Sequence, residues 1–151
     1  HHTPTRRQRQ MCIRDRPDVI SAAERAQLHE HVAKLPQEYD TLIGERGLAL
    51  SGGQRQRLNI SRSLLLGAHI LILDDSTSAV DAGTEKKIRE ALKEGAAERL
   101  TIIISHRVAS LMHADQIVYM EDGRILERGN HEELIKQGGN YAQLYQLQTL
   151  D

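Results

Sequence analysis

The sequence predicts an α/β fold in which a parallel sheet is flanked by helices. Two short apolar runs, His69–Leu73 and Leu100–Ile104, have the length and the lack of alternation typical of buried parallel strands. Segments with helical spacing of apolar residues lie before, between and after these runs. Strands that alternate with helices favour one sheet covered by helices, and 151 residues is the size of one such domain.

Two helices are expected before the first strand. The spacing of apolar residues predicts one helix over 18–35, and Pro36 is expected to end it. The other is expected over 54–66, after a Ser-Gly-Gly turn and before Gly67, which suits a helix end. Together these segments predict a helical subdomain over about 18–66.

The rest of the chain, 67–151, is expected to continue the alternation. Asp81 and Thr84 can cap a helix that runs to about Glu94, with Gly95 as its stop. Asp-Gly at 122–123 is a strong hairpin signal. The other expected elements are a short helix over 108–112, hairpin strands over 116–120 and 124–127, and helices over 131–137 and 141–149.

Composition excludes several classes of protein. No apolar run approaches the length of a membrane span. The single cysteine, Cys12, rules out an internal disulfide framework. The net charge is −1, which gives no whole-chain signal for nucleic-acid binding. Phe and Trp are absent, so we expect an aliphatic core.

Residues 1–16 differ from the remainder of the chain. They hold five arginines and one acid, and without them the net charge is −5. Back-translated, residues 6–16 read in frame as a transposon-type sequencing adapter. We therefore expect 1–16 to be a non-native head, and the native sequence to begin near Pro17 and to be truncated upstream. A disordered basic arm and a nucleic-acid-binding tail are the alternatives.

The strongest local motif is Leu50-Ser51-Gly52-Gly53-Gln54, which opens a predicted helix. Two glycines let a backbone approach a ligand closely and expose its N–H groups. The start of a helix carries partial positive charge and unpaired donors, which favour an anion such as phosphate. Ser51 and Gln54 add a hydroxyl and an amide. The alternative is an ordinary Ser-capped helix after a glycine turn.

Two further motifs follow the predicted strands. Asp74 and Asp75 end the first strand, where α/β sheets gather ligands. One carboxylate there suits Mg²⁺, and a second can orient an attacking water. His106 follows the second strand, so it is expected near this pair, where imidazole can bind a terminal phosphate. The alternatives are a solvated acidic turn that caps the next helix and a structural histidine.

In their order along the chain, these motifs resemble those of the ATP-binding cassette (ABC) ATPases. Leu50-Ser51-Gly52-Gly53-Gln54 matches the family signature residue for residue, and Ile70–Asp74 is similar to its Walker B strand. Ser78–Asp81 resembles the D-loop, and His106 the switch histidine. The resemblance covers essentially all of 17–151.

The resemblance implies a P-loop NTPase core with ATP and Mg²⁺ as cofactors. It implies that Asp74 anchors Mg²⁺, that Asp75 stands at the position of the catalytic base, and that His106 holds the γ-phosphate. The residues that it places at nucleotide are Leu50, Ser51, Gly52, Gly53, Gln54, Ser78 and Asp81. In the family, each ATP lies between the P-loop of one cassette and the signature of another, so a second cassette is the implied partner.

The flanking sequences resemble exporters of the multidrug or lipid half-transporter type. Tyr39–Gly47 is similar to the exporter loop that touches the transmembrane helices, and the tail from Asp122 to Tyr145 is similar to that of half-transporters. This implies a transmembrane domain as a further partner, a place at the cytoplasmic face of a bacterial plasma membrane, and no nucleic acid. A DNA-repair or chromosome-structure ATPase and an inert fragment are the alternatives.

The sequence departs from the family pattern in two ways. No lysine follows a glycine, so the Gly-Lys-Ser/Thr of a P-loop is missing. We expect it in the truncated part, and we expect this chain alone to be inactive. Asp75 stands where the family usually has Glu, and a carboxylate drawn back by on the order of 1 Å can cost roughly 10²-fold in rate. The shorter acid favours the degenerate site of a heterodimer, and a homodimer that tolerates Asp is the alternative.

Overall fold

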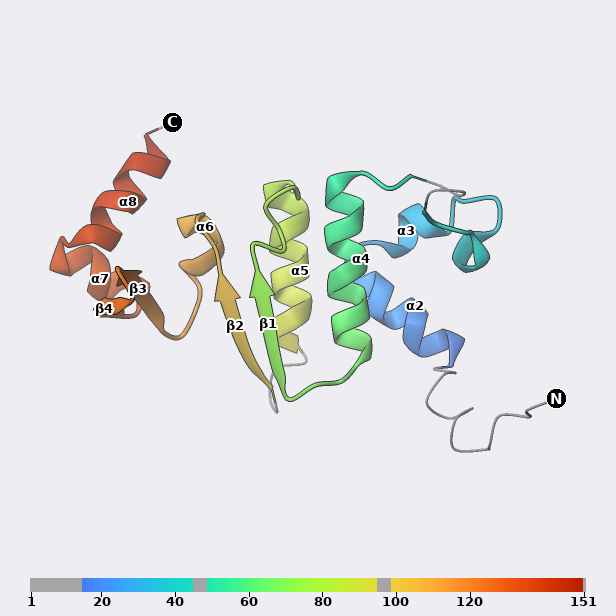
Figure 1. The fold of residues 1–151 in the computed structure, drawn as a ribbon, viewed down its shortest axis with the longest axis horizontal. Helices are drawn as coiled ribbons and strands as arrows, with labels where there is room; N and C mark the ends of the chain where they lie inside the picture. Colours follow the sequence, from blue (N-terminus) through green and yellow to red (C-terminus); the bar gives the residue numbers. More distant parts are fainter. Residues whose placement is uncertain (1–14, 45–48, 95–98, 151) are drawn as a thin grey trace. The chain divides into compact units, whose positions relative to one another are not determined.

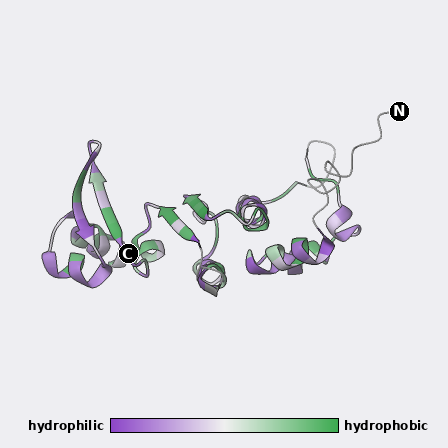
Figure 2. Ribbon diagram, turned by 90° about the horizontal axis from the view of Figure 1, so that it is seen from below, coloured by the Kyte–Doolittle hydropathy of each residue, from purple (hydrophilic) through white to green (hydrophobic). Residues whose placement is uncertain are grey.

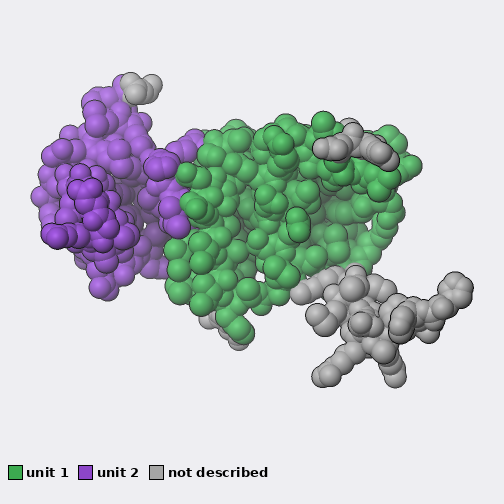
Figure 3. Space-filling view, viewed as in Figure 1, with its two compact units in different colours: residues 1–102 green, residues 103–151 purple. Residues whose placement is uncertain are grey.

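A computed structural model describes residues 15–44, 49–94 and 99–150 (Figure 1). The chain divides into two compact units, residues 1–102 and 103–151, which are described in turn (Figure 3). Most of the predicted head, residues 1–14, lies outside the described residues, as does Gly95. No helix within the three described ranges is long and apolar enough to cross a membrane.

The first unit contains helices packed beside a pair of strands (Figure 1). Helix α2 contacts α4 and α5, and three small residues at its packed face, Ala22, Ala23 and Ala26, are buried. Arg25 Nη2 also donates to the carbonyl of Ala91 on α5 at 3.1 Å. The elements are α2 (Arg16–Arg25), α3 (His29–Val32), η1 (Glu38–Asp40), α4 (Gly52–Leu65), β1 (Ile70–Asp74), α5 (Ala82–Glu94) and β2 (Leu100–Ile104).

The single helix expected over 18–35 is wrong. Gln27 has a φ of 56°, in the left-handed region, and it separates α2 from α3. Arg57 on α4 donates from Nη1 to the carbonyl of Gln27, which stabilises this break from outside the segment. Because the break shifts the helical phase, Ala26 and Leu28 are both buried although they lie only two positions apart.

Strands β1 and β2 form the parallel pair that the sequence predicts, with α5 as the crossover between them. The N–H of Leu100 donates to the carbonyl of His69 at 2.8 Å, which fixes the two strand starts side by side. The expectation that both strands are buried is wrong, and in β2 Leu100, Ile102 and Ile104 are exposed. Leu71 and Leu73 are buried, whereas Ile70 and Ile72 are 57% and 60% exposed. Figure 2 colours both strands as largely hydrophobic.

The second unit is a hairpin packed with short helices. Strands β3 (Ile117–Glu121) and β4 (Arg124–Gly129) pair antiparallel, with a bulge between Tyr119 and Met120. Asp122 and Gly123 form the predicted turn, with φ values of 49° and 74°. The unit also contains α6 (Val108–Leu111), α7 (His131–Gln137) and α8 (Asn140–Thr149), close to the expected ranges.

Composition predicted an aliphatic core, but the core of the second unit also contains a tyrosine. Tyr141 is buried together with Val108, Ile117 and Leu134. Its hydroxyl lies 2.8 Å from Nδ1 of His131, so the buried polar group has a partner. Burial raises the pKa of Tyr141, because the charged phenolate is disfavoured away from water.

Candidate functional site

The start of α4 has the geometry of a capping box. The hydroxyl of Ser51 accepts from the N–H of Gln54 at 3.2 Å, and Gln54 Oε1 accepts from the N–H of Ser51 at 2.8 Å. Both side chains therefore make the contacts of an ordinary Ser-capped helix. Between them, Gly52 and Gly53 carry first-turn N–H groups, which a helix leaves without an intrahelical partner. Such backbone groups can donate hydrogen bonds to an anion.

The two glycines differ in what surrounds them. A Cβ on Gly53 would lie 2.7 Å from the carbonyl oxygen of Ala79, which is closer than real Cβ atoms approach. A Cβ on Gly52 would lie 3.5 Å from Cβ of Ala79, an ordinary contact. Gly53 is therefore required for packing α4 against the turn that follows β1, apart from any ligand.

Asp74 and Asp75 lie at the C-terminal end of β1, as predicted. Asp75 has a φ of 43°, so the backbone turns sharply straight after the strand. The N–H of Ser78 donates to the carbonyl of Asp75 at 3.2 Å and closes this turn. Asp74 is exposed and Asp75 partly buried.

The described residues include no group of three or more His, Cys, Asp or Glu that could hold a metal ion. Asp74 nevertheless has the chemistry that Mg²⁺ requires when phosphate oxygens and waters supply its other ligands. A single exposed carboxylate at the end of a strand therefore fits Mg²⁺ that is also bound by the phosphates of a nucleotide.

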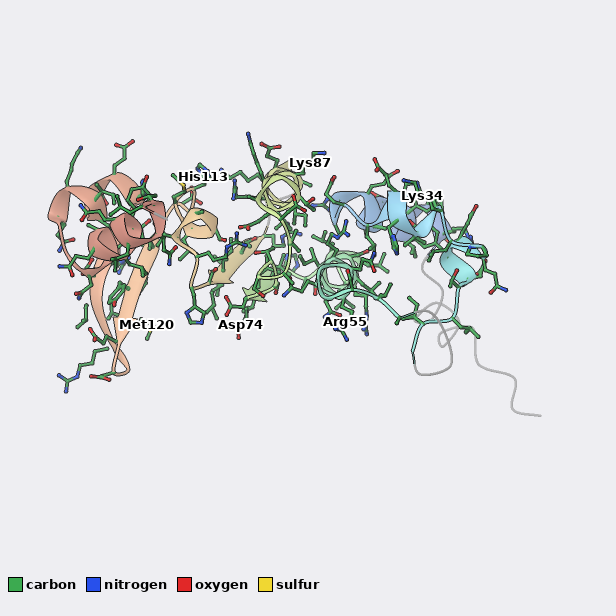
Figure 4. All side chains as sticks on the ribbon, turned by 90° about the horizontal axis from the view of Figure 1, so that it is seen from above. Lys34, Arg55, Asp74, Lys87, His113 and Met120 are labelled. Atoms are coloured by element: carbon green, nitrogen blue, oxygen red, sulfur yellow. The ribbon has the colours of Figure 1, made fainter. Side chains whose placement is uncertain are left out.

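Gln56, which the sequence analysis did not single out, joins α4 to the turn after β1. Its Nε2 donates to the carbonyl of Asp75 at 3.2 Å and to the hydroxyl of Ser78 at 2.8 Å. Its Oε1 accepts from the N–H of Ala79 at 2.9 Å. Figure 4 labels Arg55, the residue before Gln56 on α4, and Asp74, the last residue of β1 before this turn. A polar residue in a helix carries no periodic signal, so only tertiary structure identifies it.

Asp81 caps α5, which confirms the expected helix start. Its Oδ1 accepts from the N–H of Thr84 at 2.9 Å. This hydrogen bond favours the ionised carboxylate and lowers the pKa of Asp81. Ser78 and Asp81 are the two D-loop residues that were predicted to contact the nucleotide. In the structure Ser78 accepts a hydrogen bond from Gln56, and Asp81 caps α5.

Leu50 is partly buried. Gln54, the residue after the two glycines, contacts helix α3. Nε2 of Gln54 lies 3.3 Å from Nδ1 of His31 on α3. This contact makes His31 a neighbour of the segment Leu50–Gln54. Of the exporter-like segment Tyr39–Gly47, residues 45–47 lie outside the described residues.

His106 belongs to the second unit, in the segment between β2 and α6. The side-chain amide of Gln148 on α8 makes two hydrogen bonds to this segment. Its Nε2 donates to the carbonyl of His106 at 2.7 Å, and its Oε1 accepts from the N–H of Val108 at 2.8 Å. His106 is exposed. The end of α8 therefore sets the backbone that carries this histidine.

Comparison with known proteins agrees with the motifs. A family model described as "ABC transporter" matches residues 2–78, so the chain belongs to the ABC transporter family. Several relatives have names of exporters, among them a lipid A-core flippase and putative multidrug export proteins, and the fold of the chain is that of the ABC ATPases.

Three relatives illustrate this. The chain is 54% identical over 134 residues to the uncharacterized ABC transporter ATP-binding protein YknU of Bacillus subtilis, covering 89% of this chain and 23% of that protein. It is 49% identical over 133 residues to an ATP-dependent lipid A-core flippase of Haemophilus influenzae, covering 88% and 23%. A solved bacterial Atm1-family ABC exporter with ATP bound matches with a TM-score of 0.83 and 40% identity, covering 89% and 23%. The chain thus spans about a quarter of the length of these relatives.

Proposed function

We propose that this chain forms part of the ATP-binding and ATP-hydrolysing cassette of an ABC exporter, in which closure of two cassettes around ATP drives transport. One observation carries the proposal. The start of α4, with its two glycine N–H groups, packs directly against the turn that follows Asp74 and Asp75. Phosphate donors and carboxylates thus belong to one compact unit.

In this proposal the residues act by position and charge, as phosphoryl transfer requires. Gly52 and Gly53 donate their N–H groups to the γ-phosphate of an ATP held by a second cassette, and the helix N-terminus adds partial positive charge. Asp74 binds Mg²⁺, which neutralises phosphate charge when bound. Asp75 orients the attacking water on this chain's own nucleotide, and His106 donates a hydrogen bond to its γ-phosphate.

The partners in this proposal are a second cassette and the transmembrane domain of an exporter, at the cytoplasmic face of a bacterial membrane. Relatives named as a flippase and as multidrug export proteins support an exporter over a DNA-repair ATPase. The shorter acid at Asp75 supports the degenerate half of a heterodimer, because a carboxylate set back by about 1 Å orients water poorly. The sequence contains no Gly-Lys-Ser/Thr, so the 151-residue chain alone binds Mg-ATP weakly and does not hydrolyse it. Titration calorimetry tests this, and low-micromolar affinity contradicts it.

The test of the whole proposal is ATPase activity in the parent transporter, expressed with its upstream sequence and its partner cassette. Ser51→Arg places a bulky side chain where phosphate docks, so turnover collapses. Ser63→Arg makes the same change further along α4, where the hydroxyl donates to the carbonyl of Asn59 on the same helix, and turnover is kept.

Asp75→Asn tests the degenerate site in the same assay. It lowers the rate by less than about tenfold, well short of the loss of a competent general base. Asp122→Asn is the matched control, because Asp122 also has a positive φ but lies in the hairpin turn. If Asp75→Asn abolishes turnover as fully as Ser51→Arg, the chain is an ordinary homodimeric half-transporter. If Ser51→Arg has no effect, the phosphate site at α4 is refuted.

A further inference from the structure

The side-chain amide of Gln56 contacts both ends of the turn 75–79. Its donor group contacts the carbonyl of Asp75 at the first residue and the hydroxyl of Ser78 near the last. Its oxygen accepts from the N–H of Ala79. One side chain thus makes three hydrogen bonds to a five-residue segment, all from a position just beyond the capping box that Ser51 and Gln54 form at the start of α4.

The turn has a strained residue at its start. A φ of 43° at Asp75 is costly for a residue with a Cβ, and surrounding contacts must hold it. Within the turn, Ser78 N–H bonds the Asp75 carbonyl at 3.2 Å, and Val80 N–H bonds the Thr77 carbonyl at 2.9 Å. Gln56 adds a second donor to the Asp75 carbonyl from outside the turn.

The neighbouring arginines of α4 do not share this role. Arg57 extends elsewhere, to the carbonyl of Gln27 and to the carbonyl of Gly53 on its own helix. Arg55 is exposed. The close approach of Gly53 to Ala79 places the same turn against the helix without any polar contact.

We propose that Gln56 is a positioning residue, which locks the turn 75–79 to α4 and so fixes Asp75 relative to the glycine donors at the start of that helix. The lock itself is a property of the described fold. Its effect on turnover rests on the proposed function, in which the helix start and Asp75 serve different nucleotides. In that setting one amide relates the two nucleotide sites of an ATP-bound pair of cassettes.

Amide exchange in the 151-residue chain tests the lock without nucleotide. Gln56→Ala removes the acceptor of the Ala79 N–H, so we expect exchange at Ala79 to accelerate about tenfold. Arg55→Ala, on the same helix turn and with an exposed side chain, leaves it unchanged. Equal protection of Ala79 in Gln56→Ala and wild type would overturn the proposal.

ATPase kinetics in the parent transporter test the consequence. Gln56→Glu keeps an acceptor for the Ala79 N–H but loses the donor to the Asp75 carbonyl. We therefore expect exchange at Ala79 to stay near wild type while kcat falls about as far as in Asp75→Asn, by less than about tenfold, with little change in KM for ATP. A wild-type kcat in Gln56→Glu and in Gln56→Ala overturns the positioning role. If the unaltered parent does not hydrolyse ATP, the proposed function fails, and the exchange result still decides the lock.

Discussion

The contrast between Gly52 and Gly53 gives the sharpest prediction about stability. In Gly53→Ala the new Cβ meets the Ala79 carbonyl oxygen at 2.7 Å, a backbone atom that no side-chain rotation can remove. The turn must move by about half an ångström, and such overpacking typically costs about 1–3 kcal/mol. The higher helix propensity of alanine relative to glycine offsets at most about 1 kcal/mol of this cost. Gly52→Ala meets only an ordinary 3.5 Å contact, so it is neutral or gains that propensity.

We therefore expect Gly53→Ala to be less stable than Gly52→Ala by about 2 kcal/mol. Urea unfolding of the 151-residue chain, followed by circular dichroism, measures the difference through the transition midpoint. Equal midpoints for the two variants would refute the packing role of Gly53. Gly52→Ala then becomes the variant of choice for the phosphate role, because it narrows the approach to the backbone while the packing is kept.

Three further predictions concern other parts of the chain. Asp81→Ala lowers the Tm by a few degrees and Asp81→Asn by less, since Asn still caps α5. Folding lowers the pKa of Asp81 below its ordinary value of 3.8, so the ionised side chain stabilises the fold at any pH above 3.8. An acid titration of the Tm shows this stabilisation being lost as the pH falls through the lower, folded-state pKa. Glu127 is 7% exposed and accepts from two backbone N–H groups at the start of α8, so Glu127→Ala costs about 1–3 kcal/mol in urea unfolding and Glu127→Gln, which keeps one acceptor, costs less. Removal of residues 1–16 leaves the Tm unchanged, since the described contacts that it removes are the exposed Arg16–Asp40 ion pair and two hydrogen bonds to the carbonyl of Asp15 at the start of α2; a drop of several degrees would show that the head packs.

Features set by local chemistry were predictable from the sequence. The Asp-Gly pair specified the hairpin because a two-residue turn needs positive φ at both positions, and Asp122 and Gly123 adopt it. The cap of α5 by Asp81 was equally readable, because acceptor and donor lie three residues apart. The parallel pair followed from two apolar runs around one helix.

Features that depend on distant contacts were not predictable. The break at Gln27 depends on a left-handed backbone conformation that glutamine rarely adopts. Arg57, 30 positions later, stabilises it by donating to the carbonyl of Gln27. The apolar run Ile70–Leu73 showed that both faces of β1 are hydrophobic, but not that one face is exposed in this chain. Gln56 carries neither hydrophobic periodicity nor a capping position, so its bridge appears only in three dimensions.

The contacts at Ala79 also change how mutations in the signature should be interpreted. Ser51 makes its hydrogen bonds within the first turn of α4, so its substitution tests phosphate binding with little effect on the turn. Gly53 and Gln56 both contact Ala79, so a change at either moves the segment that carries Asp75. A loss of turnover in a Gly53 variant is therefore ambiguous between a lost phosphate donor and a displaced carboxylate. The pair of Ser51→Arg and Asp75→Asn separates the two sites, because each change leaves the bridge between them in place.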